Sequence, residues 1–202
     1  MHTGVVRTDF DPQALPAREF YRLLTAVVVP RPIAWVSSTS GAGVDNLAPH
    51  SFFTVSCVTP PVVQFTSVGR KDSLRNIEDT GEFVVNLAPE PLFEQINASA
   101  TNFPPGVDEF AELGLAKEPS ARVRPPRVAQ SPVALECSLH STLLLGDSTV
   151  VFGTVLHAAV DERVLIDGHP SIDRLRPLAR LGGDEWSTIG EVRELARIRY
   201  SG

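Results

Sequence analysis

The sequence predicts a mainly β protein with peripheral helices, organised as one domain over residues 1–202. Segments rich in β-branched and aromatic residues recur along the chain, helical segments are few and short, and turn residues separate them at frequent intervals. Many strands, few short helices and frequent turns favour a β-barrel with peripheral helices. A chain of 202 residues suits a single domain and can bury a core without a disulfide or a metal.

The first third of the chain predicts one helix and three strands. A proline precedes residues 17–24, which suit a short helix because proline is favoured in the first helical turn. Residues 31–38 form an apolar strand that ends before a glycine-rich turn. Residues 51–58 and 62–68 are rich in β-branched and aromatic residues and predict two further strands. The two prolines between them cannot donate ladder hydrogen bonds, so they belong in a loop or at a strand start.

The middle of the chain predicts a helix, a strand and a second helix. Asp72 is a favourable N-cap for a helix over residues 72–79, and Gly81 is a favourable stop. Residues 83–87 predict a strand, and residues 91–100 predict a helix.

The last part of the chain contains the clearest strand pair. Residues 101–130 are rich in proline, glycine and charge and predict a long surface excursion with one short helix, over residues 108–113. Residues 135–145 and 149–160 flank Gly146-Asp147-Ser148 and predict a long hairpin. The tail then leads to a final strand or helix.

Composition excludes several classes of function. The formal net charge of −6 and the pI near 5.4 argue against a nucleic-acid surface, although a local basic patch could still bind a phosphate. Cys57 and Cys137 lie far apart in apolar contexts and form no metal-binding motif, so we expect buried free thiols and no metal site. We find no signal peptide and no run of about 18 apolar residues, and therefore expect a cytoplasmic protein without a membrane span.

The segment Arg70-Lys71-Asp72-Ser73 predicts a phosphate site. If Asp72 caps the helix, the amides of Ser73 and Leu74 point out of its positive end. Two cations and the Ser73 hydroxyl add further donors. The alternative is a solvated basic turn before a surface helix.

The segment Asn46-Leu47-Ala48-Pro49-His50-Ser51-Phe52-Phe53 predicts a ligand-binding loop beside an apolar strand. Leu47, Ala48 and Pro49 have apolar side chains, so their contribution would come from backbone amides and carbonyls. Pro49 restrains the loop and favours an extended Ala48, and Ser51 adds a hydroxyl. The alternative is a plain loop between two strands.

These two segments, in this order, resemble the FMN-binding split-barrel family of flavin reductases, in particular its flavoredoxin-like branch. The resemblance continues through Ser56-x-x-Thr59-Pro60-Pro61, Asp108-Glu109-Phe110 and Ala179-Arg180-Leu181-Gly182-Gly183. It implies a split β-barrel and bound FMN, with FAD as another possibility. The residues that it places at the cofactor are Arg31, Asn46, Leu47, Ala48, Pro49, His50, Ser51, Ser67, Arg70, Lys71, Asp72, Ser73, Asn76, Arg180, Leu181, Gly182 and Trp186.

The chain departs from the family pattern at three positions. His50 stands where relatives often have tyrosine, and it either lies at the edge of the flavin or is a polar loop residue. Trp186 stands approximately where a tyrosine usually follows Arg-Leu-Gly-Gly; it either stacks on the ring or packs in the core or an interface. Ser148 replaces the histidine of Gly-Asp-His in many NADH-using members, which leaves the electron donor open. His140 and His157 lie in apolar strands and are expected to be core or interface residues.

The resemblance implies an NAD(P)H-dependent flavin reductase, in which a hydride passes from the nicotinamide to flavin N5. No Ser/His/Asp or paired-carboxylate constellation stands out, so no catalytic acid or base is assigned. The alternative is a flavoredoxin-like electron carrier that works with a protein redox partner; a flavin-binding protein without turnover is a third hypothesis. A homodimer is implied, with a monooxygenase or other redox protein as a partner. Arg122, Arg124 and Arg127 form either a docking patch for an acidic partner or a solvated loop.

Overall fold

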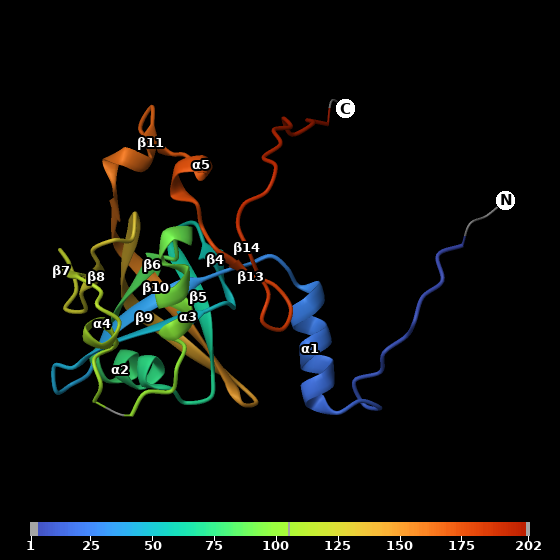
Figure 1. Ribbon diagram of the computed structural model, residues 1–202, viewed down its shortest axis with the longest axis horizontal. Helices are drawn as coiled ribbons and strands as arrows, with labels where there is room; N and C mark the ends of the chain where they lie inside the picture. Colours follow the sequence, from blue (N-terminus) through green and yellow to red (C-terminus); the bar gives the residue numbers. More distant parts are fainter. Residues whose placement is uncertain (1–3, 105, 201–202) are drawn as a thin grey trace.

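The computed structural model describes residues 4–104 and 106–200 and is built around a seven-stranded antiparallel sheet that curves into a barrel (Figure 1). The strand order is β3-β2-β6-β9-β10-β5-β4. Where β3 continues into β4, the backbone carbonyl of Phe52 accepts a hydrogen bond of 2.9 Å from the Thr66 amide of β5. The strands are β2 (Ala34–Thr39), β3 (Asp45–His50), β4 (Phe53–Cys57), β5 (Val62–Val68), β6 (Glu82–Leu87), β9 (Val133–Leu145) and β10 (Ser148–Val160).

Short helices and strand pairs surround this sheet. The helices are α1 (Ala17–Val27), α2 (Asp72–Thr80), α3 (Phe93–Ala98), α4 (Glu109–Glu112) and α5 (Ile172–Leu175), with single 3-10 turns η1 (Glu90–Leu92) and η2 (Glu162–Val164). The remaining strands are β1 (Arg31–Pro32), β7 (Lys117–Glu118), β8 (Arg127–Val128), β11 (Leu165–Ile166), β12 (His169–Pro170), β13 (Ala179–Arg180) and β14 (Trp186–Ser187). The prediction of a mainly β fold with peripheral helices is confirmed. None of the helices in residues 4–104 and 106–200 is long and apolar enough to span a membrane.

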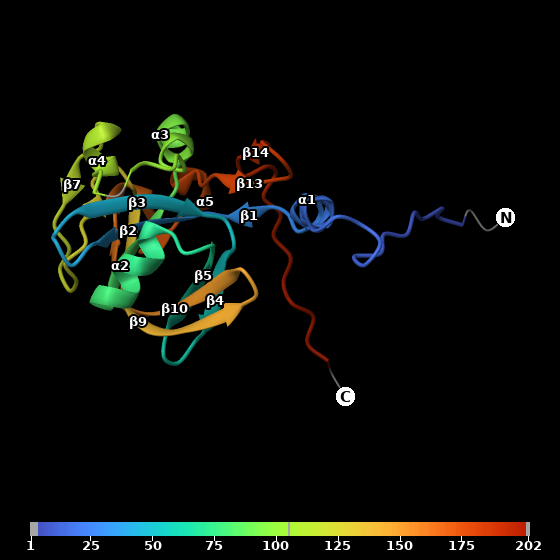
Figure 2. The same ribbon diagram turned by 90° about the horizontal axis from the view of Figure 1, so that it is seen from below.

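Two apolar clusters position the helices on the sheet. Inside the barrel, Phe65 and Phe83 pack edge to face with centroids 5.7 Å apart, and Leu74 and Ile77 of α2 join them. Aromatic pairs of this geometry add to the free energy of burial. Figure 2, seen from below, shows α2 lying across one end of the barrel. On the other side of β2, Trp35 packs beneath α3 and α4, and its indole N–H donates to the Ser99 hydroxyl at 2.9 Å.

Two expectations for the first third of the chain were wrong in detail. The strand predicted over residues 31–38 is divided into β1 and β2, which belong to different sheets. Residues 46–50 were expected to be a loop but belong to β3, which pairs with β2. Pro49 is tolerated there because β3 lies at the edge of the sheet, where a residue without an N–H leaves no ladder bond unmade.

The expectations for cysteine and histidine also need correction. Cys137 is buried as predicted, and burial raises the pKa of its thiol to about 12. Cys57 is exposed, because it ends β4 at the other edge of the sheet. His140 is exposed because its end of the β9–β10 hairpin extends beyond the core, and His157 is half-buried, so neither is a core residue. That they lie at an interface stays a prediction.

A close contact inside the barrel gives a first prediction. A Cβ atom at Gly153 would lie 2.3 Å from the ring of Phe83 and 3.1 Å from Cys137 Cβ. Overpacking of this kind costs about 1–3 kcal/mol, so we expect Gly153→Ala to lower the free energy of unfolding by that amount in urea denaturation. Gly41→Ala is the control, because nothing lies within 4 Å of its new methyl group. Equal stability of the two variants would contradict this packing.

Candidate functional site

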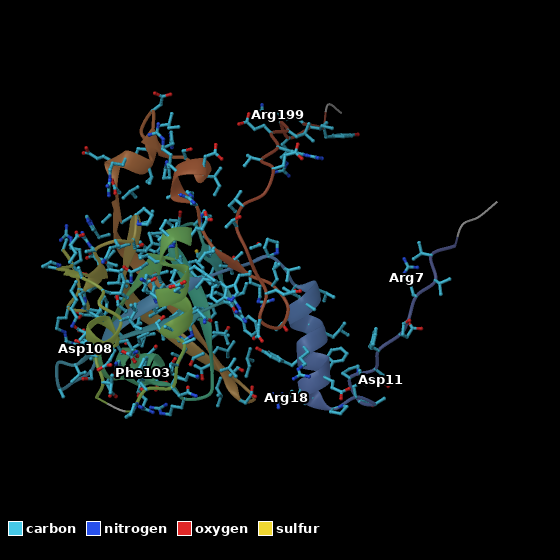
Figure 3. The ribbon with its side chains drawn as sticks, in the orientation of Figure 1. Arg7, Asp11, Arg18, Phe103, Asp108 and Arg199 are labelled. Carbon is cyan, nitrogen blue, oxygen red and sulfur yellow. The ribbon has the colours of Figure 1, made fainter. Side chains whose placement is uncertain are left out.

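A cavity of about 400 Å³ opens between the end of β3, the start of α2 and the loop that follows α3. Its volume lies within the range of small-molecule sites, about 300–1,000 Å³. Figure 3 labels Phe103, which belongs to this loop and lies beside α2. The cavity is lined by Tyr21, Asn46, Ala48, Pro49, His50, Ser51, Phe52, Thr66, Val68, Arg70, Lys71, Asp72, Ser73, Arg75, Ser99, Ala100, Thr101, Asn102, Phe103 and Glu109.

The start of α2 supplies hydrogen-bond donors to this cavity. Lys71, not Asp72, occupies the N-cap position, and no side chain caps the helix. Asp72 is the first helical residue, where its carboxylate pairs with Arg75 instead of with the first-turn amides. The first N–H groups of a helix have no partners within the helix, so they remain available to an anion. The helix start is therefore open to an anion as predicted, but its N-cap is Lys71 and not Asp72.

Two side chains at this helix start have only weak internal partners. The Lys71 ammonium donates to Asn102 Oδ1 at 3.1 Å, and the Ser73 hydroxyl donates to Asn46 Oδ1 at 3.2 Å. Both acceptors are neutral amide oxygens, so an anion would be the stronger acceptor. Arg70, by contrast, pairs with Glu78 at 2.6 Å. Lys71 is therefore the cation with the least compensated charge among the three basic residues of this wall.

The strand β3 provides the opposite wall. Ala48 and Pro49 are half-buried at the cavity, whereas Leu47 is fully buried in the core beneath α3 and α4. The Leu47 amide donates to Oε2 of Glu109 at 3.1 Å, and Glu109 is 6% exposed. The contact ties β3 to the start of α4 and fixes the position of the wall.

His50 ends β3 and is buried beside the cavity. Its ring lies on Phe65, with centroids 4.5 Å apart, and the residue is 7% exposed. Burial lowers the pKa of His50 to about 4, so the imidazole is neutral near pH 7. Its Nε2 atom is buried and makes no hydrogen bond within the described chain. A buried nitrogen without a partner is costly, which makes it a candidate contact for a ligand.

The predicted site residues nearer the C-terminus lie around two neighbouring cavities. Arg31 and Arg180 line a cavity of about 580 Å³, which also includes Ser51. A smaller cavity, of about 240 Å³, is lined in part by Pro49, Arg180 and Trp186. Trp186 packs edge to face against Phe93 at 5.1 Å, and the Arg180 guanidinium lies 4.5 Å from its ring centroid. Trp186 thus has packing partners of its own within the chain.

Besides the buried Leu47, four predicted residues line none of these cavities and instead support their walls. The Ser67 hydroxyl donates to the Gly69 carbonyl at 2.9 Å, and the Asn76 amide donates to Ser38 Oγ at 3.2 Å. The Leu181 carbonyl accepts a hydrogen bond of 2.7 Å from Arg31. Gly182 approaches α1 so closely that a Cβ atom would lie 3.1 Å from Ala26.

Sequence reasoning missed several aromatic and loop residues of the cavity of about 400 Å³ between β3 and α2. Tyr21 of α1 and residues 99–103 reach it only through tertiary packing, and no local pattern indicates this. Phe52 also lines it and belongs to the segment that the sequence indicated as a ligand-binding loop. Glu109 lies within the Asp108-Glu109-Phe110 motif, so that motif could have indicated it. Among residues 4–104 and 106–200, no three His, Cys, Asp or Glu side chains gather in a way that could hold a metal ion.

Comparison with known proteins shows which family the chain belongs to. Residues 26–174 match the family model of the flavin reductase-like domain. An uncharacterised protein of Deinococcus radiodurans is 41% identical over 96% of this chain and 91% of its own length. Nitrilotriacetate monooxygenase component B from Bacillus cereus is 31% identical, with a TM-score of 0.91 over 95% of this chain and 100% of that chain.

A second solved structure identifies the barrel type. A protein of Shewanella frigidimarina, described as a flavin reductase with a split-barrel domain, has a TM-score of 0.81 at 21% identity, over 94% of this chain and 96% of that chain. At this identity the likeness concerns the fold alone. The match over residues 26–174, together with the 41% identical relative, shows that the chain belongs to the flavin reductase-like domain family and has its split-barrel fold.

Proposed function

We propose that this protein binds FMN in the cavity between β3 and α2 and works as an NAD(P)H-dependent flavin reductase. The observation that carries the proposal is the uncapped start of α2, with Lys71 and Ser73 beside it, at one end of a cavity of about 400 Å³. A helix start with a cation and a hydroxyl suits a phosphate dianion. Membership of the flavin reductase-like family supports the flavin as the molecule that carries this phosphate.

The other walls of the cavity suit the ribityl chain and the ring. Ala48, Pro49 and Ser51 line the cavity. Backbone groups of Ala48 and Pro49 would face the ring edge, and the Ser51 hydroxyl would bind ribityl or phosphate oxygens. The neutral His50 can either donate or accept a hydrogen bond through Nε2, according to its tautomer. These residues bind and orient; none of them needs to transfer a proton in the reaction.

Bound FMN would supply the redox chemistry, namely acceptance of a hydride from the dinucleotide at N5 and delivery of electrons to an acceptor. The chain contributes by holding donor and acceptor within reach, at about 3–3.5 Å. The likeness to a monooxygenase component B at 31% identity supports a monooxygenase as the partner that takes up the reduced flavin. FAD is the alternative form of the cofactor.

An electron carrier is the second candidate function, and the β9–β10 turn favours it. This turn lies against the phosphate-site segment, because the Gly69 amide donates to the Asp147 carbonyl at 2.9 Å. Ser148 occupies the position of the histidine found in many NADH-using relatives, and its hydroxyl donates to Asp147 at 2.8 Å. A chain without this histidine can exchange electrons with a protein instead of with a dinucleotide.

The experiment that tests the function is an anaerobic absorbance titration of the FMN-loaded protein with NADH and then NADPH. We expect rapid bleaching of the flavin band, and the nucleotide that is effective at the lower concentration is the donor. A bound flavin that stays oxidised with both nucleotides would reject the reductase and favour the electron carrier. Failure to bind any flavin would reject both.

We also propose that the protein is a homodimer. Large apolar side chains are exposed at the hairpin tip, where Leu144 is 70% exposed, and on α1, where Val27 is 63% exposed. Apolar side chains gathered on a surface mark contacts with another chain. Sedimentation velocity should give twice the mass of the 21.9 kDa chain, and a monomer at micromolar concentration would contradict the proposal.

A further inference from the structure

Four arginines gather around the cavity of about 580 Å³ that adjoins the proposed flavin site; we call it the arginine cavity. Arg18 and Arg22 come from α1, Arg31 from β1 and Arg180 from β13. Figures 1 and 2 both show α1 beside the β13–β14 pair, and Figure 3 labels Arg18 on α1. Asp184 is the single acidic residue among the described residues of its lining. The cavity therefore carries a strong excess of positive charge in a chain whose net charge is −6.

Arg31 is buried without a carboxylate partner. It is 7% exposed, and its terminal nitrogens donate to the backbone carbonyls of Thr25, Val28 and Leu181. Its Nε atom is buried and has no acceptor in the described chain. A buried guanidinium with only neutral partners is costly, because carbonyl groups do not offset the loss of hydration of a full charge. An anion in the cavity would supply both the missing charge and the missing acceptor.

The other three arginines leave this charge uncompensated. The Arg180 guanidinium donates to the Gly183 carbonyl at 2.6 Å and lies over Trp186, so its partners are also neutral. Within residues 4–104 and 106–200, neither Arg18 nor Arg22 forms an ion pair. Burial, and then the charge of Arg180, lower the pKa of Arg31. Several like charges around one cavity favour the binding of an anion between them.

The position of the arginine cavity distinguishes its ligand from the flavin phosphate. It shares Tyr21 and Ser51 with the flavin cavity, whereas the segment Arg70–Ser73 lines the flavin cavity alone. If the flavin phosphate lies at the start of α2, the arginine cavity meets the flavin cavity away from that phosphate. A second molecule could thus place its anionic group among the arginines while its reactive part lies over the ring.

We propose that the arginine cavity binds the phosphate or pyrophosphate group of the second substrate, and this inference rests on the proposed function. Arginine suits this role because its planar fork of donors binds phosphate oxygens in pairs. The group can come from a nicotinamide dinucleotide that donates electrons or from a flavin nucleotide that accepts them. Because Arg31 lines the cavity and is itself buried, it suits a small phosphate-bearing group better than an extended acidic surface.

The test is calorimetric titration of the FMN-loaded protein with inorganic pyrophosphate, in a buffer free of phosphate and sulfate. We expect one binding event per chain, weakened about tenfold or more in Arg22→Gln and in Arg31→Gln, because each loses charge-assisted hydrogen bonds. Arg22 is an exposed helix residue, so its variant remains informative if Arg31→Gln fails to fold. Arg163→Gln is the control: its side chain is 90% exposed, it lies outside the arginine cavity, and it should leave the affinity unchanged.

Competition then identifies the source of the phosphate. Displacement of pyrophosphate by NADH assigns the site to the electron donor, and displacement by added FMN assigns it to a flavin acceptor; either result supports the proposal. No binding, equal affinities in the Arg22 variant and the control, or displacement by neither nucleotide would overturn it. A lowered flavin reduction potential in Arg22→Gln with unchanged pyrophosphate affinity would also overturn it, since the arginines would then act on the flavin ring.

The same titration separates this inference from the proposed function. Flavin retention is measured independently, by the absorbance of the purified protein after gel filtration. If the flavin is retained but the arginine substitutions leave the affinity for pyrophosphate unchanged, the arginine site is wrong and the flavin site stands. If no flavin is retained but the flavin-free chain shows arginine-dependent binding of pyrophosphate, the proposed function fails and the anion site stands.

Discussion

A Lys71→Ala/Ser73→Ala double variant should bind FMN about 100-fold more weakly than the unaltered protein. The two changes remove an ammonium and a hydroxyl that flank the uncapped start of α2. Each hydrogen bond to a charged group contributes about 1.5–3 kcal/mol, so the loss of two gives at least a hundredfold change in the dissociation constant. The measurement is a fluorescence titration of the flavin-free protein with FMN and, separately, with riboflavin, which lacks the phosphate.

Riboflavin provides the discriminating control within this experiment. Its affinity should be nearly the same in the double variant and in the unaltered protein, because the variant changes only phosphate contacts. Arg124→Gln serves as the charge control, since Arg124 is exposed and pairs with Glu82 outside the flavin cavity. If FMN binds the double variant with unaltered affinity, or if riboflavin is weakened equally, the phosphate site is not at the start of α2.

The largest loss of stability is expected from Glu136→Gln, by about 3–5 kcal/mol at pH 7. Glu136 is fully buried and accepts hydrogen bonds from the amides of Ala121 and Arg122 and from the Arg127 guanidinium. A glutamine removes the negative charge that faces Arg127. It also places an NH₂ group, which can only donate, against the N–H donors that now bind the carboxylate. Urea denaturation measures the change. Glu118→Gln is the matched control, because this partner of the same Arg127 is half exposed and should cost about 1 kcal/mol or less.

This carboxylate also predicts a dependence of stability on pH. Burial opposes the ionisation of Glu136, but the hydrogen bonds from Ala121, Arg127 and Arg122 outweigh it and hold its pKa below the ordinary value of 4.5. The stabilisation is therefore complete above that value and is lost as the pH falls through the lower pKa of the folded chain. The difference in unfolding free energy between wild type and Glu136→Gln should shrink in that acid range. A difference that stays constant down to pH 3 would contradict the assignment.

The parts of the fold that local chemistry decides could be predicted from the sequence. The β9–β10 hairpin is such a part. Its two-residue turn, Gly146-Asp147, holds Gly146 at a φ of 61°, a backbone conformation that few residues other than glycine favour. The end of α2 is another, since Gly81 caps it with a φ of 74°. The start of α2 was displaced by one residue because Asp72 pairs with Arg75 instead of capping.

The parts that depend on tertiary pairing could not be predicted in the same way. Pro49 indicated a loop, yet β3 forms because one side of this edge strand pairs with β2. The candidate site likewise has one part that local sequence could predict and one part that depends on tertiary packing. Lys71 and Ser73 lie in a short segment whose composition alone indicated a phosphate, whereas Arg22 reaches the arginine cavity only because α1 packs beside β13. No periodicity in α1 distinguishes such an arginine from an ordinary exposed one.

The central claim is that the cavity between β3 and α2 holds FMN with its phosphate at the helix start. A crystal structure of the FMN-loaded protein tests it most directly. The account predicts phosphate oxygens at about 3 Å from the Ser73 hydroxyl, the Lys71 ammonium and the first amides of α2, with the ring along Ala48 to Ser51 and in contact with His50 Nε2. If the phosphate of the bound FMN lies among Arg22, Arg31 and Arg180, or if the FMN binds outside this cavity, the claim is contradicted.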